Sequence, residues 1–339
     1  MTKSTLFNIN LAVFIFFFQL CNAQTDSIKL SPPIVFGSIY PGFVTTISNN
    51  TKPNYAFEMN TALVGFKTDI AHKVNAILIY DVTKTTGDIT VTDSNGTTQN
   101  VTFFKGSDFT AFLKQAEINW KPTKHIELAM GQLLNEQYLT VQDKFWGYRY
   151  VAFTFQERYK FGYQADFGFR LAYVNEKLRI SAGIFNGEGP LYKQDINGRL
   201  MYALNAEYRP NEHFIFKIYG DIYPSPSVNK QCLSVFIAYK TEKYRLAIEG
   251  CNTQNDKWNK LSDYMGFSGF FSYKVANKWN VFIREDYLEK SLLYNNTSIS
   301  FLGTQYEPVK NFNIALNYRI YSTSYTNTQQ IALNVGIKF

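Results

Sequence analysis

The last nine residues, Ile331-Ala332-Leu333-Asn334-Val335-Gly336-Ile337-Lys338-Phe339, alternate between large apolar side chains at odd positions and small or polar ones at even positions. Residues 312–321 and 163–173 repeat this alternation. A period of two over such a length is the pattern of a β-strand with one apolar face. Tilted strands of this length also match the thickness of a lipid bilayer.

The predicted strands end in an aromatic residue that is followed by a short polar turn. Successive aromatic ends are 35, 31, 34, 33 and 33 residues apart, at Tyr173, Tyr208, Tyr239, Tyr273, Tyr306 and Phe339. Two strands, one short turn and one loop account for each interval. Aromatic residues gathered at one level beside short turns are typical of the interfacial girdle of a membrane barrel.

The same pattern can be followed along most of the chain. Upward strands should start near residues 36, 74, 125, 177, 213, 243, 279 and 312, and downward strands should end near 68, 121, 173, 208, 240, 274, 307 and 339. The sequence thus predicts an all-β fold, a closed antiparallel transmembrane β-barrel of about 16 strands (14–18), with short periplasmic turns. Closure leaves no open strand edge in the hydrocarbon. A soluble sandwich or propeller would explain neither the aromatic levels nor the regular turns.

Composition narrows the class of protein. The 339 residues are 45% hydrophobic, 17% aromatic and 18% charged, with a net charge of +7. These values exclude a disordered chain and a disulfide-dense scaffold. A mean hydropathy of −0.21 excludes a helical membrane bundle.

The N-terminal segment has the layout of a cleaved secretory signal. Lys3 precedes the apolar run of residues 11–20, and Ala23 supplies a small residue at the expected cleavage site. We expect residues 1–23 to be a cleaved signal peptide and residues 24–339 to form the barrel. In an alternative lipoprotein reading, Cys21 would be the acylated residue.

Two loops are longer than the others. Residues 85–108 are polar and could contain a short hairpin of their own. Residues 134–160, the third loop on the long side, are rich in aromatic side chains. Because this loop is too apolar for a solvated surface, we expect it to fold inward and narrow the lumen.

Two short motifs resemble a known family. Trp146-Gly147-Tyr148-Arg149-Tyr150-Val151, followed by Phe153-Thr154-Phe155-Gln156, and Asn186-Gly187-Glu188-Gly189 resemble blocks of the porin-like outer-membrane proteins of Bacteroidota-type bacteria, loosely the phosphate-selective porin O/P-like group. The resemblance is sharpest over residues 130–225. The resemblance implies a diffusion channel that assembles as a trimer. The regular lysine ladders expected of a dedicated phosphate channel are not evident.

The sequence offers no arrangement for catalysis. His72, His125 and His213 all fall at predicted short turns, away from any nucleophile. Phosphate-binding, nucleophile-elbow and metal-ligand motifs are absent, so we expect no enzyme, no cofactor, no metal and no nucleic-acid partner. The Gly-flanked acid Glu188 is better explained as turn chemistry than as a calcium ligand.

Strand alternation assigns charged residues of both signs to the lumen. The predicted pore-lining residues are Arg170, Arg179, Lys217, Arg245, Arg284, Arg319, Asp166, Asp221, Glu249 and Asp286. The predicted constriction residues, from loop 134–160, are Arg149, Arg158, Lys160, Glu136 and Asp143. Opposed charges at a constriction would create a transverse field and a weak ion preference. Solvated lumen charges and structural ion pairs are the alternative interpretation.

Three further residues carry predictions. Cys232 and Cys251 would lie directly opposite each other if their strands pair symmetrically about the turn, which would permit a cross-strand disulfide in an exported protein. Phe339, at the end of the last apolar strand face, is the expected assembly signal read by the outer-membrane assembly machinery.

We therefore expect a porin in the outer membrane of a Gram-negative bacterium, passing small hydrophilic solutes or ions by passive diffusion. Outer-membrane lipid, two further copies of the chain and the assembly machinery are its expected partners. The alternative is a low-conductance barrel that serves as a surface adhesin or structural anchor.

Overall fold

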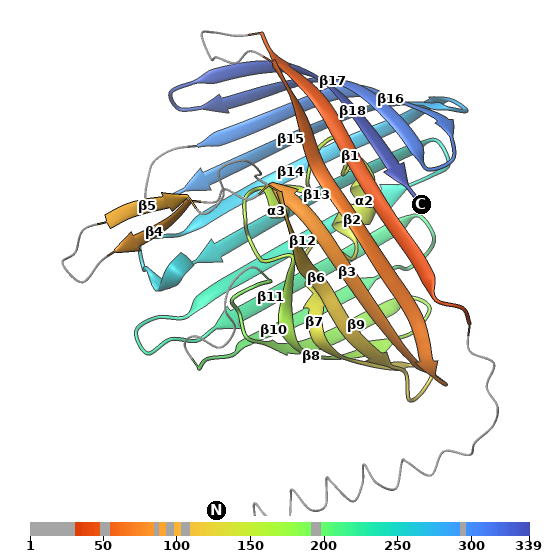
Figure 1. Cartoon of the computed structure of the whole chain (residues 1–339), viewed down its shortest axis with the longest axis vertical. Helices are drawn as coiled ribbons and strands as arrows, with labels where there is room; N and C mark the ends of the chain where they lie inside the picture. The colour runs from red at the N-terminus through yellow and green to blue at the C-terminus, as the bar shows by residue number, and fades with distance from the viewer. Residues whose placement is uncertain are drawn as a thin grey trace, which may run out of the picture.

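The computed structural model describes residues 31–47, 55–84, 88–92, 98–102, 109–190, 198–291 and 296–339. The predicted signal peptide, residues 1–23, lies outside these ranges. Within the described residues, sixteen strands form one closed antiparallel barrel, in which β1 pairs with both β2 and β18 (Figure 1).

The predicted strand number is confirmed. Each predicted start or end lies within three residues of the observed one, the largest difference being between residue 68 and Ala71. The barrel strands are β1 (Ile34–Thr46), β2 (Tyr55–Ala71), β3 (Val74–Lys84), β6 (Phe109–Trp120), β7 (Ile126–Leu134), β8 (Ala165–Val174), β9 (Leu178–Phe185), β10 (Met201–Tyr208), β11 (Phe214–Tyr223), β12 (Lys230–Lys240), β13 (Tyr244–Gln254), β14 (Tyr264–Ala276), β15 (Trp279–Lys290), β16 (Thr297–Val309), β17 (Phe312–Thr323) and β18 (Asn327–Lys338).

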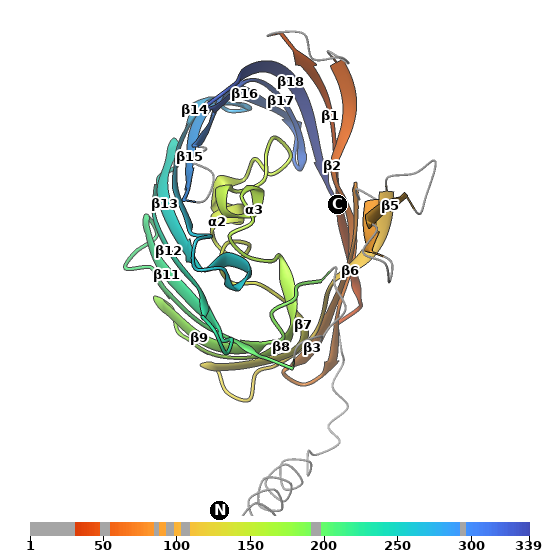
Figure 2. The ribbon, with the colours of Figure 1, turned by 90° about the vertical axis from the view of Figure 1, so that its left-hand side faces the viewer.

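The polar loop 85–108 contains the short hairpin that its sequence allowed. Strands β4 (Asp88–Thr92) and β5 (Thr98–Thr102) pair only with each other. They lie beside the barrel wall and outside the ring of strands (Figure 2). The hairpin therefore does not change the number of barrel strands.

The outer face of the wall is apolar. On β8, for example, Phe167, Phe169, Leu171 and Tyr173 are 37–44% exposed, while Arg170 between them faces inward and bonds the carbonyl oxygen of Leu134. This alternation is what a barrel surrounded by hydrocarbon requires. No helix among the described residues is long and apolar enough to cross a membrane.

Aromatic rings meet across neighbouring strands beside the short turns. Trp279 is paired with Tyr306 at a centroid distance of 4.6 Å, and Phe214 with Tyr239 at 4.8 Å. Because register partners lie at one level of the wall, these rings form the aromatic level that the sequence predicted.

The barrel closes where the first and last strands meet. The backbone N–H of Gly37 donates to the carbonyl of Phe339 at 2.9 Å, and the N–H of Phe339 donates back to Gly37 at 3.1 Å. Phe339 thus takes part in the ladder that closes the barrel, and the residue is 60% exposed.

Deleting Phe339 should reduce membrane insertion. The deletion removes both seam bonds, worth about 1–3 kcal/mol together, and the aromatic ring that is the predicted assembly signal. Folded protein in isolated outer membranes is measured by heat-modifiable migration on gels. The variant Phe339→Ala is the matched control because it keeps the backbone bonds and removes only the ring. Normal insertion of both variants would contradict the assembly role.

Candidate functional site

The segment between β7 and β8, residues 135–164, lies inside the ring of strands (Figure 2). We call it the inner loop. It contains two short helices, α2 (Gln142–Trp146) and α3 (Phe155–Arg158). A bond from the N–H of Asn135 to the carbonyl of Gln164, 2.9 Å long, ties its two ends together. The inner loop extends four residues beyond the predicted boundary at 160, because β8 begins only at Ala165.

Aromatic side chains of the inner loop pack against the inner face of the barrel wall. Between ring centroids, the distance is 5.7 Å from Phe145 to Phe236 and 5.1 Å from Trp146 to Phe270. The centroids of Tyr148 and Phe282 are 4.5 Å apart. Together with smaller side chains they form one buried apolar cluster. Burying each large side chain contributes about 1.5–3 kcal/mol, so the cluster holds the loop firmly. This packing explains the apolar composition of the segment.

Cations on alternate wall strands bind the backbone of the inner loop. Lys217 on β11 donates to the carbonyls of Glu136 and Gln137, the second at 3.1 Å. Arg245 on β13 donates to the Phe145 carbonyl at 2.9 Å. Arg284 on β15 and Arg319 on β17 donate to the carbonyls of Phe153 and Val151 at 2.7 and 3.0 Å. These side chains thereby satisfy carbonyls that a non-repetitive segment would otherwise leave unpaired.

A glycine in the first family-like motif has a clear structural role. Gly147 ends α2 with a left-handed φ of 70°, and its N–H donates to the carbonyl of Asp143. A Cβ atom there would lie 2.7 Å from a guanidinium nitrogen of Arg245. Glycine is therefore needed both for the turn and for the close approach of this cation.

Arg149, a predicted constriction residue, is buried within the inner loop. Its guanidinium bonds Asp143 at 2.7 Å and both carboxylate oxygens of Glu157 at 2.5 and 2.6 Å. Only 9% of the residue is exposed. Burial would lower the pKa of Arg149, but the two carboxylates raise it well above its ordinary value, so the residue stays charged. This ion triad fixes the loop's shape.

Glu136 is the centre of a second charged cluster at the start of the inner loop. Its carboxylate accepts hydrogen bonds from Arg179, at 2.8 and 3.0 Å, and from Ser181. It also forms an ion pair with Arg170 at 3.7 Å. Burial would raise the pKa of Glu136. The positive charges of Arg170 and Arg179 outweigh that effect and hold the pKa below the ordinary 4.5.

The remaining predicted residues differ in their surroundings. Arg158 is half-buried, with its guanidinium 5.5 Å from the ring centre of Phe301, and Lys160 is exposed. Glu249 accepts from Gln156 of the inner loop at 2.7 Å, and Asp286 bonds Arg284. Asp166 instead accepts from the N–H of Gly187 at 2.6 Å in the turn after β9, and Asp221 lies opposite Cys232. Most predicted lumen residues therefore bind the inner loop.

Sequence reasoning missed several polar contacts inside the barrel. Gln137, Gln142 and Gln156 are almost fully buried, and Gln142 bonds both the Gln137 carbonyl and Lys217. Neutral amides in a loop carry no periodic signal. Lys114 and Asp81 form a buried ion pair at 2.5 Å. A register shift between β3 and β6 breaks the alternation there, which hides Lys114 from a period-two pattern.

The predicted opposition of Cys232 and Cys251 is wrong. Cys232 pairs with Thr253, and Cys251 with Ser234, because the register about the β12–β13 turn is offset by two residues. The two cysteines are diagonal neighbours with their Sγ atoms 3.5 Å apart, and both are free thiols. A disulfide bond is about 2.05 Å long, so the bond that the sequence allowed is absent from this structure.

The histidines occupy the short turns, as predicted. Nδ1 of His125 lies 2.9 Å from the carbonyl of Val174, and Nδ1 of His213 lies 3.0 Å from that of Lys240. In the part of the chain that the structure describes, no three His, Cys, Asp or Glu residues could jointly hold a metal ion.

Comparison with solved structures defines the class of fold. No protein-family model and no curated protein matches the sequence. In structure, however, the chain is similar to outer-membrane porins and channels. At identities this low, the similarity establishes a sixteen-stranded porin-type barrel.

Three examples show the extent of this similarity. OmpF of Salmonella typhi, in a complex with daunomycin, superposes with a TM-score of 0.64 and 13% identity over 91% of this chain and 97% of that one. The outer membrane channel DcaP of Acinetobacter baumannii superposes with a TM-score of 0.58 and 10% identity over 91% of this chain and 97% of that one. The trimer form of OmpT, an outer membrane protein of Vibrio cholerae, superposes with a TM-score of 0.58 and 8% identity over 91% of this chain and 99% of that one.

Replacing Arg284 by Met should strongly destabilise the barrel. The change leaves the fully buried Asp286 without its cation and the Phe153 carbonyl without its donor, at a cost of about 3–5 kcal/mol. The double variant R284M/D286L should recover part of this loss, because it also removes the uncompensated charge. Urea unfolding followed by tryptophan fluorescence measures the difference, with Lys177→Met in the exposed β8–β9 turn as control. A double variant less stable than R284M would contradict the analysis.

The charge of Glu136 should make loop docking depend on pH. Because the folded-state pKa is depressed, its stabilising contribution is present above the unfolded value of 4.5 and is lost as pH falls through the folded value. The difference in unfolding free energy between wild type and Glu136→Gln should be constant from about pH 8 to 6 and should shrink below 4.5. A difference that stays unchanged down to about pH 3 would contradict this assignment.

Proposed function

We propose that the chain is an outer-membrane porin, a passive diffusion channel for small hydrophilic solutes whose lumen is narrowed by the inner loop. The observation that carries this proposal is the docking of residues 135–164 inside a closed barrel, held by cations from four alternate wall strands. A loop anchored in this way reduces the cross-section of the lumen, while the strands around it remain one closed ring.

The apolar outer face and the aromatic level support a location in the outer membrane of a Gram-negative bacterium. DcaP is itself described as an outer membrane channel, and OmpT of Vibrio cholerae in a trimer form. These likenesses support a channel that assembles from copies of this chain. From its sequence, we propose that residues 1–23 are removed after export.

The surroundings of the charged residues refine the proposed constriction. Lys160 is exposed and Arg158 is half-buried, so these two offer charge to a passing solute, whereas Asp143 is paired with Arg149 at 2.7 Å. Arg149 and Glu136 are tied into ion pairs and act by fixing the loop. Charges of both signs on the wall favour a general solute channel over the phosphate-selective type suggested by the motif resemblance.

Single-channel current across a planar bilayer tests the proposal directly. Refolded protein should give stable stepwise conductance under a KCl gradient, and the sign of the reversal potential reports which charge dominates the pore. A folded barrel that passes no current would contradict the porin function and favour the alternative of a surface adhesin or structural anchor.

The double substitution R245Q/R319Q should increase conductance and current noise. It removes the donors of the Phe145 and Val151 carbonyls, and each lost charge-assisted bond weakens loop docking by about 1.5–3 kcal/mol. Lys177→Gln, in the exposed turn between β8 and β9, is the matched control. An unchanged current in the double variant would show that the inner loop does not set the conductance.

A further inference from the structure

One acidic residue faces outward from the barrel wall. On β15, Arg284 and Asp286 point inward, where they bond each other, so Glu285 between them points outward. Glu285 is exposed, as are its outward neighbours Ile283 and Tyr287, at 50% and 38%. Within the part of the chain that the structure describes, the Glu285 carboxylate has no hydrogen bond and no ion pair. The isolated barrel therefore leaves this charge unpaired on its outer surface.

The height of Glu285 places it within the apolar band of the wall. The residue is six positions from Trp279, which belongs to the aromatic level beside the short turns. At about 3.3 Å per residue and a tilt of about 45°, Glu285 lies roughly 14 Å from that level, near the middle of an apolar band about 25 Å tall. A charged side chain on the lipid-facing surface destabilises a barrel most at this depth. Hydrocarbon is therefore a poor cover for this part of the wall.

Small residues flank Glu285 on both neighbouring strands. On β16, Ile299 and Phe301 are buried inside the barrel, so Ser300 between them faces outward. Ser300 is the register partner of Glu285 on one side, and Gly269 of β14 is its partner on the other side. A Cβ atom at Gly269 would meet no atom nearer than 3.9 Å. The carboxylate is thus open to a group that approaches from outside the wall.

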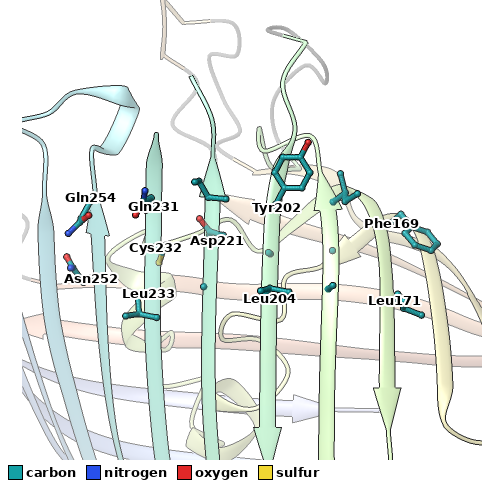
Figure 3. Close-up of a pocket in the computed structure, with 16 residues that line it drawn as sticks. Phe169, Leu171, Tyr202, Leu204, Asp221, Gln231, Cys232, Leu233, Asn252 and Gln254 are labelled. Atoms are coloured by element: carbon teal, nitrogen blue, oxygen red, sulfur yellow. The ribbon is translucent and has the colours of Figure 1, made fainter. Parts of the chain in front are cut away.

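The wall formed by β8 to β12 has a different outer surface. Leu233 on β12 is six positions from Tyr239, the aromatic end of its strand, and so corresponds in height to Glu285. Leu233 is 53% exposed, and Leu204 on β10 is 66% exposed in the same apolar groove (Figure 3). Hydrocarbon suits these leucines, so the β8 to β12 wall needs no other cover.

The outer face of β14 to β16 carries both halves of a polar contact. The carboxylate of Glu285 accepts hydrogen bonds, and the outward hydroxyl groups of Ser298 and Ser300 can donate them. Such charge-assisted bonds are strong where water is excluded. Because acceptor and donors lie on adjacent strands, this face can bond a second face identical to itself. Self-complementarity of this kind is what association between copies of one chain requires.

We propose that the outer face of β14 to β16 is the contact surface for a second copy of this chain. Glu285 of one copy accepts hydrogen bonds from the Ser298 and Ser300 hydroxyls of the other, and the exposed side chains of Ile283 and Leu302 pack around these bonds. The contact removes the carboxylate from hydrocarbon and gives it the donors that a single barrel lacks. The inference rests on the proposed membrane location and assembly but not on conduction, so the two can fail separately.

Native mass spectrometry of the detergent-solubilised protein over a dilution series tests the contact. Wild type should form an oligomer, and Glu285→Leu should raise its dissociation constant about tenfold or more, the equivalent of one charge-assisted hydrogen bond. Glu285→Gln keeps an acceptor oxygen and should have a smaller effect. Gln231→Leu is the matched control, because it also replaces an exposed, outward polar residue by leucine. A monomeric wild type, or a folded Glu285→Leu that associates like wild type, would overturn the proposal.

Photo-crosslinking in isolated outer membranes identifies what covers this face. The photoreactive residue p-benzoyl-phenylalanine replaces Leu302, which is 59% exposed beside Ser300, or Leu204, which is 66% exposed on the other wall, as control. Irradiation should give a covalent dimer of this chain from position 302 only. A product with a different protein, a dimer from position 204 only, or no dimer from a folded barrel would overturn the proposal.

Two further variants keep the test independent of folding and of conduction. Ser300→Ala, which removes a donor, should also weaken association and replaces Glu285→Leu if the latter fails to fold by heat-modifiable migration. The conductance of a single barrel should be the same in Glu285→Leu and wild type, because Glu285 faces away from the lumen. A chain that associates through this face but passes no current would contradict the porin function alone.

Discussion

The hydrogen bond from a lumen cation to a loop carbonyl is the interaction on which the interior of this barrel depends. In a closed sheet the ladder uses the backbone groups of the strands, so the inner loop can obtain few partners from the wall backbone. Lys217, Arg245, Arg284 and Arg319 supply donors in their place, one from every second strand. Their long side chains reach inward from the wall, and their charges are compensated by acids such as Asp286. A mixed-charge lumen is therefore a consequence of holding an irregular segment inside a regular cylinder.

The two sides of the barrel interior contact the inner loop with different kinds of side chain. Strands β11 to β17 are apolar outside, where the hydrocarbon lies, and also present Phe236, Phe270 and Phe282 inward to the inner loop. Strands β7 to β10 instead present charged and polar groups, including Glu127, Arg179 and Glu207, which bond one another and the start of the loop. Both halves of the wall thus bury side chains against the inner loop, the first with many aromatic rings and the second mainly with ion pairs and polar contacts.

The sequence predicted the wall well and the interior less well, for physical reasons. Side-chain alternation and aromatic strand ends are local properties, so sixteen strands and their limits could be placed to within three residues. Alternation also gives the direction of a side chain, and it correctly turned Arg284 and Arg319 inward. Alternation cannot identify the partner of an inward-facing side chain, because the carbonyls that Arg284 and Arg319 bind are 131 and 168 residues away in the chain. Arg149 was expected at the constriction and is instead enclosed by Asp143 and Glu157, a contact that depends on the fold of the loop itself. The cysteine register failed because one turn is asymmetric by two residues.

The position of the inner loop in the chain has a consequence for the order of folding. The loop follows β7, yet its anchors belong to β11, β13, β15 and β17, which come much later in the chain. Contacts between such distant residues close large chain loops, and they form slowly compared with hairpins between neighbouring strands. The aromatic side chains of the inner loop therefore stay unburied until the second half of the wall has assembled around them. During that interval the nascent barrel exposes these apolar side chains, and closure of the β1–β18 seam encloses them.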